Sequence, residues 1–272
     1  MRLLVGLVRL VHPAPTLAVA SLSAALGAIL GAETGNPSDI RLPLTVLAVL
    51  GSQILTGALN DWTDRARDAM AQPTKPIPSG VVAPPMALTL AGAGLALQVG
   101  ASLPLGLAPM TLGLAASASA ISYNLWLSRT PLSVVPYLVS FGLLPLWVAA
   151  GVGVPLERVA LAPILIGPFA AAAHLANTLR DFDADATLGS RNFAQVLGRR
   201  AAFGMAWSLA MGVGLAVGFA LILGGILEPP GVLLGVIGLA AVAQGIAGSH
   251  RLWMGMLVAA VCWTAAWALA TG

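Results

Sequence analysis

The chain has 272 residues, of which 58% are hydrophobic and only 8% are charged, whereas a soluble domain carries roughly 25% charged residues. This composition excludes an ordinary soluble protein. The formal charge of +3 is better explained by the side of a membrane on which the charges lie than by nucleic-acid binding. The single cysteine, Cys262, excludes an intrachain disulfide and a thiolate metal site.

Nine apolar runs follow one another along the chain, each close to the roughly 18 to 20 residues with which a helix crosses a bilayer. In chain order they are 14–32, 42–59, 84–103, 105–127, 132–152, 159–179, 201–223, 231–248 and 252–270. None shows the period-two alternation of a membrane barrel. The sequence therefore predicts an all-α, polytopic membrane helical bundle with nine transmembrane helices, in a single domain over 1–272. The first run is interpreted as a retained helix rather than a cleaved signal peptide.

The lysines and arginines divide unevenly between the two sides that nine crossings would create. All of them except Arg41 and Arg158 fall on the side of the N-terminus and of the loops after the second, fourth, sixth and eighth helices. Because positively charged loops stay in the cytoplasm, this side is predicted to be cytoplasmic, in a cell (inner) membrane. One helix more or fewer would scatter the charges over both sides.

Six of the ten acidic residues are gathered in two short segments, each at the cytoplasmic end of a predicted helix. The first acidic segment, "NDWTDRARD" at 60–68, ends the second helix. Asn60, Asp64 and Asp68 are four residues apart and share one stripe of a helix, with Asp61 at its edge. This stripe is the first candidate site.

The second acidic segment, "NTLRDFDAD" at 177–185, ends the sixth predicted helix. If that helix continues, Asn177, Asp181 and Asp185 repeat the four-residue spacing, and His174 lies on the same stripe one turn deeper. Asp183 falls on the opposite side and is predicted to take no part. Four helices separate the two segments, so they lie on the same side and can face each other. The spacing also suggests two four-helix repeats followed by a ninth helix.

Carboxylates grouped this closely repel one another unless a cation lies between them. Oxygen ligands favour a hard cation such as Mg²⁺, which leaves coordination positions for substrate phosphates. Both segments are followed by basic residues that suit a diphosphate, namely Arg65, Arg67 and Lys75, then Arg191, Arg199 and Arg200. Clusters of ionisable groups at membrane depth are costly and usually functional. The segments therefore indicate a Mg²⁺–diphosphate site for a lipid with an apolar tail; for any one aspartate, a solvated membrane border is the alternative.

Three stretches carry a family resemblance. "NDWTDRARD" matches an NDxxDxxxD motif and "TKPIPSG" the tail that follows it; "DFDADATLGSRNFAQVLG" resembles a second DxxxD segment; "YNLWLSRTPLS" resembles a stretch between helices four and five. Together they resemble the UbiA superfamily of intramembrane prenyltransferases over essentially the whole chain. Two departures bear on metal coordination and basic charge: Thr178 stands where many relatives have an aspartate, and Ser190 where a lysine is common.

The resemblance implies an enzyme that uses Mg²⁺ to move a polyprenyl group from an isoprenoid diphosphate to an acceptor. Carried over residue by residue, it assigns catalytic roles to Asp64, Asp181 and Asp185. The implied metal ligands are Asn60, Asp61, Asp64, Asp68, Asn177, Asp181 and Asp185. The implied diphosphate-binding residues are Arg67, Lys75, Arg129 and Arg191, and those near the acceptor are Tyr123, Asn124 and His174. Helix packing is the alternative role for His174, and interfacial anchoring the alternative for Tyr123.

The acceptor is predicted to be an aromatic or quinone-precursor ring, and the partners are the isoprenoid diphosphate, this acceptor and membrane lipid, with no nucleic acid. The alternative acceptor is a non-aromatic lipid hydroxyl or a tetrapyrrole carboxylate, because "KPIPSG" resembles the ether-lipid and chlorophyll-synthase subgroups at least as well. A cation-coupled transporter is the rival from another class, but transporter sites usually lie near the membrane midplane. A catalytically silent relative is the third possibility, which only Thr178 suggests.

Overall fold

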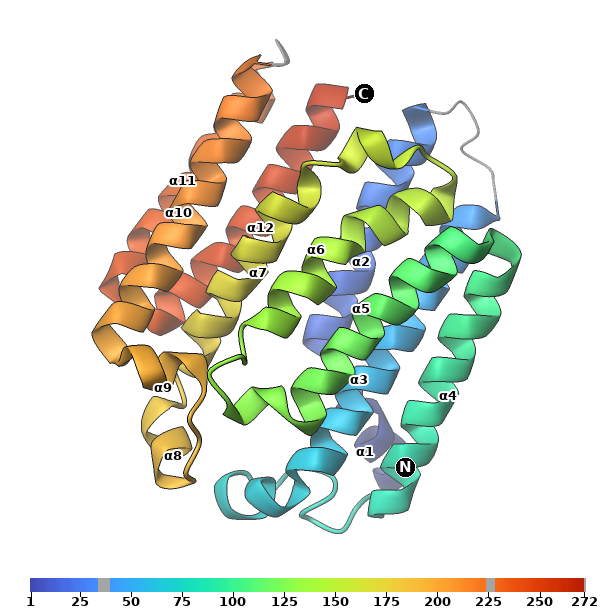
Figure 1. Ribbon diagram of the computed structural model, residues 1–272, viewed down its shortest axis with the longest axis vertical. Coiled ribbons are helices and arrows are strands. Elements are labelled where there is room, and N and C mark those ends of the chain that lie inside the picture. The colour runs from blue at the N-terminus through green and yellow to red at the C-terminus, as the bar shows by residue number, and fades with distance from the viewer. Residues whose placement is uncertain (34–39, 224–227, 272) are drawn as a thin grey trace.

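The computed structural model describes residues 1–33, 40–223 and 228–271, and its regular structure there is entirely helical (Figure 1). Nine long helices make up the bundle in this described part. They are α2 (Pro13–Glu33), α3 (Arg41–Ala71), α4 (Pro84–Ser102), α5 (Leu107–Leu125), α6 (Val135–Val152), α7 (Ala162–Thr178), α10 (Arg199–Leu223), α11 (Pro229–Gln244) and α12 (Ser249–Thr271). Each coincides with one of the nine apolar runs, so the predicted all-α fold is confirmed.

Among the described residues, six helices are long and apolar enough to cross a membrane: α2, α3, α4, α6, α10 and α11. The nine crossings and the two four-helix repeats stay predictions. The remaining elements are short. They are α1 (Arg2–Leu10), α8 (Phe182–Thr187) and α9 (Phe193–Leu197), with 3-10 turns η1 (Leu103–Leu105), η2 (Leu127–Arg129), η3 (Leu156–Val159) and η4 (Gly245–Ala247).

Proline and glycine mark where several helices begin and end. α4 begins at Pro84 and α11 at Pro229, the first helical position, where the missing N–H of proline costs nothing. α6 ends at Gly153, whose φ of 82° lies in the left-handed region that glycine adopts without strain. The Gly153 N–H bonds the last free carbonyls of α6, those of Ala149 and Ala150.

α3 and α4 approach each other closely through two glycines. A Cβ atom on Gly51 of α3 would lie 2.6 Å from the carbonyl oxygen of Gly94 on α4, and a Cβ on Gly94 would lie 2.5 Å from the Leu55 nitrogen. Neither position has room for a methyl group. Small residues at helix crossings permit such close approach in membrane bundles. α3 also contacts α2, α5 and α6, so it runs through the centre of its part of the bundle.

The apolar core has two main parts. One is formed by α7, α9, α10, α11 and α12, around buried residues such as Leu175 and Met256. The other is formed by α3, α4, α5 and α6, around residues such as Val49 and Trp147. The packed pair α6 and α7 joins them. The first acidic segment ends α3 and the second follows α7, so the two segments come from different parts and meet at one end of the bundle (Figure 1).

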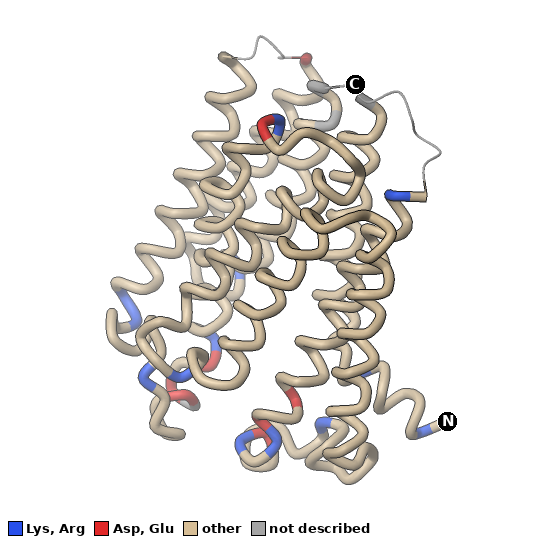
Figure 2. Tube along the Cα trace, turned by 45° about the vertical axis from the view of Figure 1, so that its right-hand side comes forward, with Lys and Arg blue, Asp and Glu red and all other residues tan. Residues whose placement is uncertain are grey.

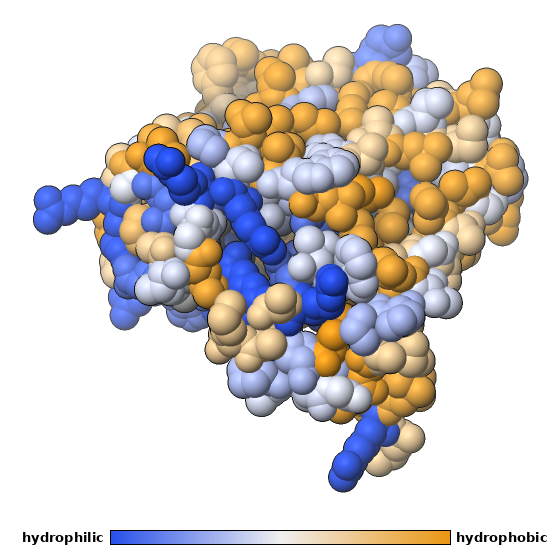
Figure 3. Space-filling model, turned by 60° about the horizontal axis from the view of Figure 1, so that its bottom comes forward, coloured by the Kyte–Doolittle hydropathy of each residue, from blue (hydrophilic) through white to orange (hydrophobic). Residues whose placement is uncertain are grey.

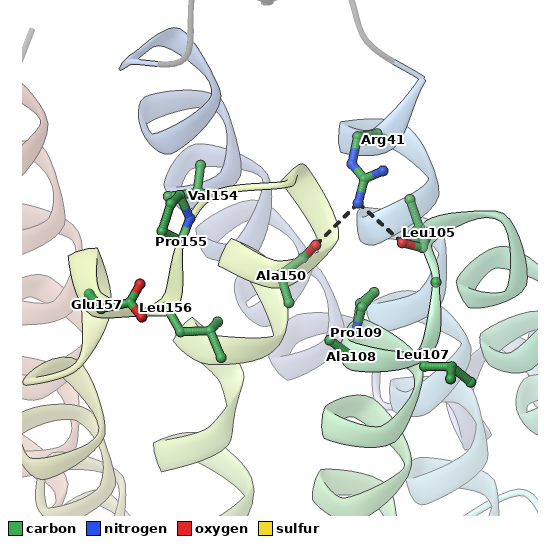
Figure 4. A pocket seen from close by; sticks show the side chains of 11 residues that line it. Arg41, Leu105, Leu107, Ala108, Pro109, Ala150, Val154, Pro155, Leu156 and Glu157 are labelled. Atoms are coloured by element: carbon green, nitrogen blue, oxygen red, sulfur yellow. Dashed lines mark hydrogen bonds between the residues drawn. The ribbon is translucent and has the colours of Figure 1, made fainter.

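The charged residues concentrate at that end, where α8 and α9 lie (Figure 2). At the opposite end, Arg41 ties two helix ends together: its Nε donates to the Gly151 carbonyl at 3.0 Å and its Nη2 to the Leu105 carbonyl at 3.1 Å. A cleft of about 490 Å³ opens beside it, with Glu157 as its one acidic residue (Figure 4). This cleft lies far from both acidic segments, so we do not assign the chemistry to it.

Candidate active site

The first acidic segment lies on a single helix, as its spacing predicts, because α3 continues unbroken to Ala71. Asp61 and Asp68 are buried, with 2% and 5% of their surfaces exposed. Lys75 Nζ donates to Asp61 Oδ1 at 3.1 Å and to Asp68 Oδ2 at 2.8 Å. His12 Nε2 lies 3.0 Å from the same Asp61 oxygen. Lys75 and His12 therefore hold the inner two carboxylates in place.

Lys75 lies in the loop after α3, and its charge is stabilised by its partners. Burial alone would lower the pKa of its ammonium group. The hydrogen bond to Asp68 and the negative charges of Asp61 and Asp68 outweigh burial and raise the pKa of Lys75 above its ordinary value of 10.5. Lys75 is therefore a permanent cation beside the site.

Asp64 is the more accessible carboxylate of this segment, with 20% of its side chain exposed. Its Oδ1 accepts a hydrogen bond from Arg129 Nη2 at 2.8 Å, and its Oδ2 accepts one from Asn60 Nδ2 at 3.3 Å. Asn60 Nδ2 also donates to Asn124 Oδ1, at 3.2 Å, and Asn124 in turn donates to the Thr56 carbonyl. These bonds connect the end of α5 and the η2 turn to the first segment.

The second acidic segment does not continue the helix before it, which corrects the prediction of one stripe for Asn177, Asp181 and Asp185. α7 ends at Thr178, and a new short helix, α8, begins at Phe182. The Asp181 carbonyl accepts the first bond of α8, from the Asp185 N–H at 2.8 Å, which makes Asp181 the N-cap. Negative side chains in the first turn, here Asp183 and Asp185, favour a helix start because they interact with the positive end of the helix dipole.

Asp185 brings the two segments into contact. It is 8% exposed and forms an ion pair with Arg67 of the first segment. Its Oδ2 also accepts a hydrogen bond from Asn192 Nδ2 at 2.9 Å, and Asn192 caps α9 by accepting from the Gln195 N–H. A buried carboxylate from one part of the bundle therefore faces a guanidinium from the other part.

The structure leaves four predicted or neighbouring positions at the surface. Asn177 is exposed and accepts a weak bond from Arg180 at 3.4 Å. The exposed Asp181 side chain makes no hydrogen bond or ion pair to the described residues. The Arg191 side chain is also exposed, although its backbone N–H bonds the Arg129 carbonyl at 3.1 Å. Asp183 has 89% of its side chain exposed and pairs with Arg199, and the prediction that it takes no part in the site stays a prediction.

Thr178, which stands where relatives often have an aspartate, is buried and bonded within its own helix. Its hydroxyl donates to the His174 carbonyl at 2.9 Å. The hydroxyl hydrogen is therefore used in α7, and the residue is packed away from the exposed Asn177 beside it. The first carboxylate of the second segment is accordingly Asp181.

An aromatic cluster, Tyr123, Tyr137, Phe141 and His174, lies between α5, α6 and α7 beside the first segment. The His174 ring stacks on Tyr137 with ring centres 4.2 Å apart, and Tyr123 meets both rings edge-on, at 5.2 Å from Tyr137 and 5.5 Å from His174. Tyr137 also stacks on Phe141. His174 is 4% exposed, and its Nε2 lies 3.4 Å from Ser133 Oγ. His174 thus has the packing partners that its alternative interpretation requires.

The sequence analysis missed three residues of the site, of which two leave no signal in the sequence. His12 is 49 positions from Asp61 and belongs to no motif. Tyr137 lies outside both acidic segments, although the chain has only two tyrosines and both are in the aromatic cluster. Asn192 had a usable signal, because an asparagine directly before a helical stretch indicates an N-cap.

The donor chemistry of the site fits Mg²⁺, but as an ion that arrives with a substrate. Among the described residues, no three acidic, histidine or cysteine side chains converge on one point. Each buried carboxylate instead faces a basic or amide partner. Mg²⁺ sites are commonly built from one or two carboxylates plus substrate phosphates rather than from a complete protein cage. Asn60, Asp64, Asp181 and Asp185 could supply oxygen ligands of this kind from both segments.

Fold and site together define a class of protein. Viewed from the charged end, hydrophilic side chains gather across its middle, between surfaces that are largely apolar (Figure 3). A polytopic helical bundle that brings carboxylates, arginines and aromatic rings together at one mouth is typical of membrane enzymes that act on charged lipids. The model of the UbiA prenyltransferase family matches residues 21–251. The chain belongs to this family and is a membrane prenyltransferase.

Individual relatives agree with this assignment. The chain is 28% identical over 201 residues to digeranylgeranylglyceryl phosphate synthase from Natronomonas pharaonis, a match that covers 72% of this chain and 70% of the relative. It is 37% identical over 110 residues to protoheme IX farnesyltransferase from Granulibacter bethesdensis, over 36% of this chain and 34% of that protein. A UbiA homolog from Archaeoglobus fulgidus bound to DMAPP and Mg²⁺ has the same fold, with a TM-score of 0.72 and 15% identity over 97% of this chain and 98% of that one.

Proposed function

We propose that this chain uses Mg²⁺ to transfer a polyprenyl group from an isoprenoid diphosphate to an acceptor, at the mouth where the two acidic segments meet. The observation that carries the proposal is the contact between Arg67 and Asp185, which joins the first segment to the second. Such a pairing of carboxylate and guanidinium groups suits a ligand that carries both phosphates and a divalent cation. The relative from Archaeoglobus fulgidus with DMAPP and Mg²⁺ supports the same ligand class.

The chain's own residues stabilise the leaving diphosphate. Arg67 and Arg129 are oriented by Asp185 and Asp64, so their N–H groups lie where the segments meet and donate to phosphate oxygens. Lys75, which is bonded to Asp68, adds a fixed positive charge beside the site. When bound, Mg²⁺ supplies further positive charge that favours departure of the diphosphate. Groups arranged in advance for the charge that develops are the main source of such rate enhancement.

The aromatic cluster protects the carbon that loses the diphosphate. Asn124 links the cluster's Tyr123 to the first segment, because it accepts a bond from Asn60. The rings of Tyr137 and His174, which are stacked on each other, provide an apolar surface beside the first segment that shields a positively charged allylic carbon. Exclusion of water also prevents hydrolysis, in which a water molecule would capture this carbon.

The acceptor is an aromatic or quinone-precursor ring, which can pack against the aromatic cluster. A lipid hydroxyl is the second candidate, because the relative with the longer match is named for the synthesis of a glyceryl phosphate ether lipid. The shorter match, to a protoheme farnesyltransferase, keeps a tetrapyrrole acceptor among the alternatives. The mouth faces the cytoplasm, because nearly all lysines and arginines lie on its side of the bundle.

The proposal is tested with the purified chain in detergent, geranylgeranyl diphosphate, Mg²⁺ and one acceptor at a time. The acceptors are 4-hydroxybenzoate, geranylgeranylglyceryl phosphate and protoheme. With one of these acceptors, geranylgeranyl diphosphate is expected to lose diphosphate and a prenylated product is expected to form. Chelation of Mg²⁺ is expected to stop the reaction. If geranylgeranyl diphosphate is not consumed with any acceptor but a cation gradient moves it across liposomes, the transporter is the correct function.

A further inference from the structure

The N-terminal helix α1 has a packed face, an exposed apolar face and a basic edge between them. Gly6, Leu7 and Leu10 pack against Ile77 and Val82 of the loop after α3. The opposite face is apolar and exposed: its residues Leu4, Val5 and Val8 are 67%, 53% and 52% exposed. Arg2 and Arg9, two helical turns apart, form the edge between these faces. Figure 2 shows this segment projecting from the side of the bundle at its charged end.

A cleft of about 250 Å³ lies between this basic edge and the loop. Arg2, Val5 and Arg9 line it from α1, and Pro76, Ser79 and Val81 line it from the loop. Neither arginine side chain makes a hydrogen bond or an ion pair with the part of the chain that the structure describes. Two guanidinium groups without partners at one cleft form a binding site for a phosphate-bearing anion, because each can donate two parallel hydrogen bonds to phosphate oxygens.

The surroundings identify the source of that anion. An amphipathic helix with one exposed apolar face and arginines at its edge lies in the plane of the membrane interface. α1 contacts α3 and α4, which are both long and apolar enough to cross a membrane, so α1 lies next to the membrane interface that these helices define. We propose that the cleft binds the phosphate headgroup of an anionic phospholipid, with the apolar face of α1 among its acyl chains.

The site is connected to the acidic segments by two short links. Lys75, which bridges Asp61 and Asp68, directly precedes Pro76 of the cleft. His12, two residues after the end of α1, contacts Asp61 at 3.0 Å. A lipid bound in the cleft therefore holds α1 against the loop from which Lys75 projects. The proposal does not depend on which acceptor the enzyme uses.

Native mass spectrometry of the full chain in detergent, titrated with phosphatidylglycerol or phosphatidylcholine, tests the site. The variant Arg2→Ala/Arg9→Ala is expected to bind phosphatidylglycerol about 30-fold more weakly than wild type. This equals about 2 kcal/mol, because a basic side chain near a membrane surface contributes about 1 kcal/mol. The matched control, Arg200→Ala/Arg251→Ala, removes two exposed arginines at the starts of α10 and α12 and is expected to bind as wild type does.

Three outcomes would overturn the proposal. The Arg2→Ala/Arg9→Ala variant could bind phosphatidylglycerol as tightly as wild type, or the control could be weakened equally, which would indicate diffuse charge attraction. Displacement of the lipid by millimolar inorganic phosphate would indicate a site for a soluble anion instead. Both arginines are exposed, so the melting temperature of each variant is expected to match wild type, and a matching value excludes misfolding as the cause of lost binding.

Discussion

Two aspartates only two positions apart, Asp183 and Asp185, have opposite environments. Asp185 is buried and contacts Arg67 and Asn192, whereas Asp183 is exposed to solvent beside Arg199. An exposed ion pair contributes little to stability, so loss of Asp183 should have little effect. Loss of the buried Asp185 would leave its basic partner unpaired at the junction of the two parts of the bundle. The pair therefore offers a matched test inside one short helix.

We predict that Asp185→Ala lowers prenyl transfer by about 100-fold or more, the typical loss when one preorganised charged group is removed. Asp183→Ala is expected to keep activity within about twofold of wild type. Product formation from geranylgeranyl diphosphate measures both, with the melting temperature of each preparation as a control for folding. Equal activity of the two variants would contradict the assignment of Asp185.

Lys75→Met is predicted to destabilise the protein, because it leaves Asp61 and Asp68 buried without their shared cation. The expected cost is about 2 to 4 kcal/mol. The pKa of Lys75 is raised in the folded state, so its contribution is complete below pH 10.5 and is lost as the pH rises through the higher folded value. The difference in melting temperature between wild type and variant in detergent is expected to be the same at pH 7 and pH 9, and to become smaller above pH 10.5. Identical melting at pH 8 would show that the bridge is not needed.

At the scale of single residues, the sequence predicted the helical arrangement of the first acidic segment better than that of the second. The four-residue rule described Asn60, Asp64 and Asp68 because one continuous helix carries them. The same rule was wrong for Asp181 and Asp185, since it assumes an unbroken helix, while Asp181 caps a new one. Contacts between distant positions, such as that of His12 with Asp61, depend on tertiary packing and leave no local pattern.

At the scale of elements, hydrophobic runs predicted where the long helices lie, because a membrane helix must be apolar over its whole length. They gave no indication of α1 as a separate helix or of the break between α7 and α8. With nine residues, α1 is too short to stand out as an apolar run, although its apolar and basic faces are separate. Short helices such as α9 are marked in the sequence by a capping residue, here Asn192. Helix crossings depend instead on small residues, as the contact of α3 with α4 shows.

Gly94→Ala is predicted to destabilise the bundle by about 1 to 3 kcal/mol, the typical cost of overpacking. The new methyl would lie 2.5 Å from the backbone nitrogen of Leu55, and a backbone atom cannot rotate away. Gly92→Ala is the matched control on the same helix, because a Cβ there has no atom within 4 Å. Melting temperatures in detergent compare the two. Alanine is the better helix former, so Gly92→Ala is expected to melt at or slightly above the wild-type temperature. A Gly92 variant as unstable as the Gly94 variant would show that the α3–α4 contact is not responsible.

At the scale of the whole molecule, the uneven distribution of lysine and arginine predicts the orientation. With Cys262 replaced by alanine, Ser79→Cys lies at the charged end and Leu107→Cys at the opposite end, and both positions are exposed. A membrane-impermeant maleimide is expected to label Leu107→Cys in intact cells and Ser79→Cys only after permeabilisation. Labelling of both from the same side would contradict the cytoplasmic mouth.

The central claim is that both acidic segments hold one diphosphate ligand together. A double-mutant cycle tests it most directly: Asp64→Ala, Asp185→Ala and the double variant, with the affinity for the non-reactive geranylgeranyl thiolodiphosphate measured at saturating Mg²⁺. We predict that each single variant binds at least about tenfold more weakly and that the double variant is little worse than either, a coupling of more than about 1 kcal/mol. Additive losses, or single variants that bind as tightly as wild type, would contradict the claim.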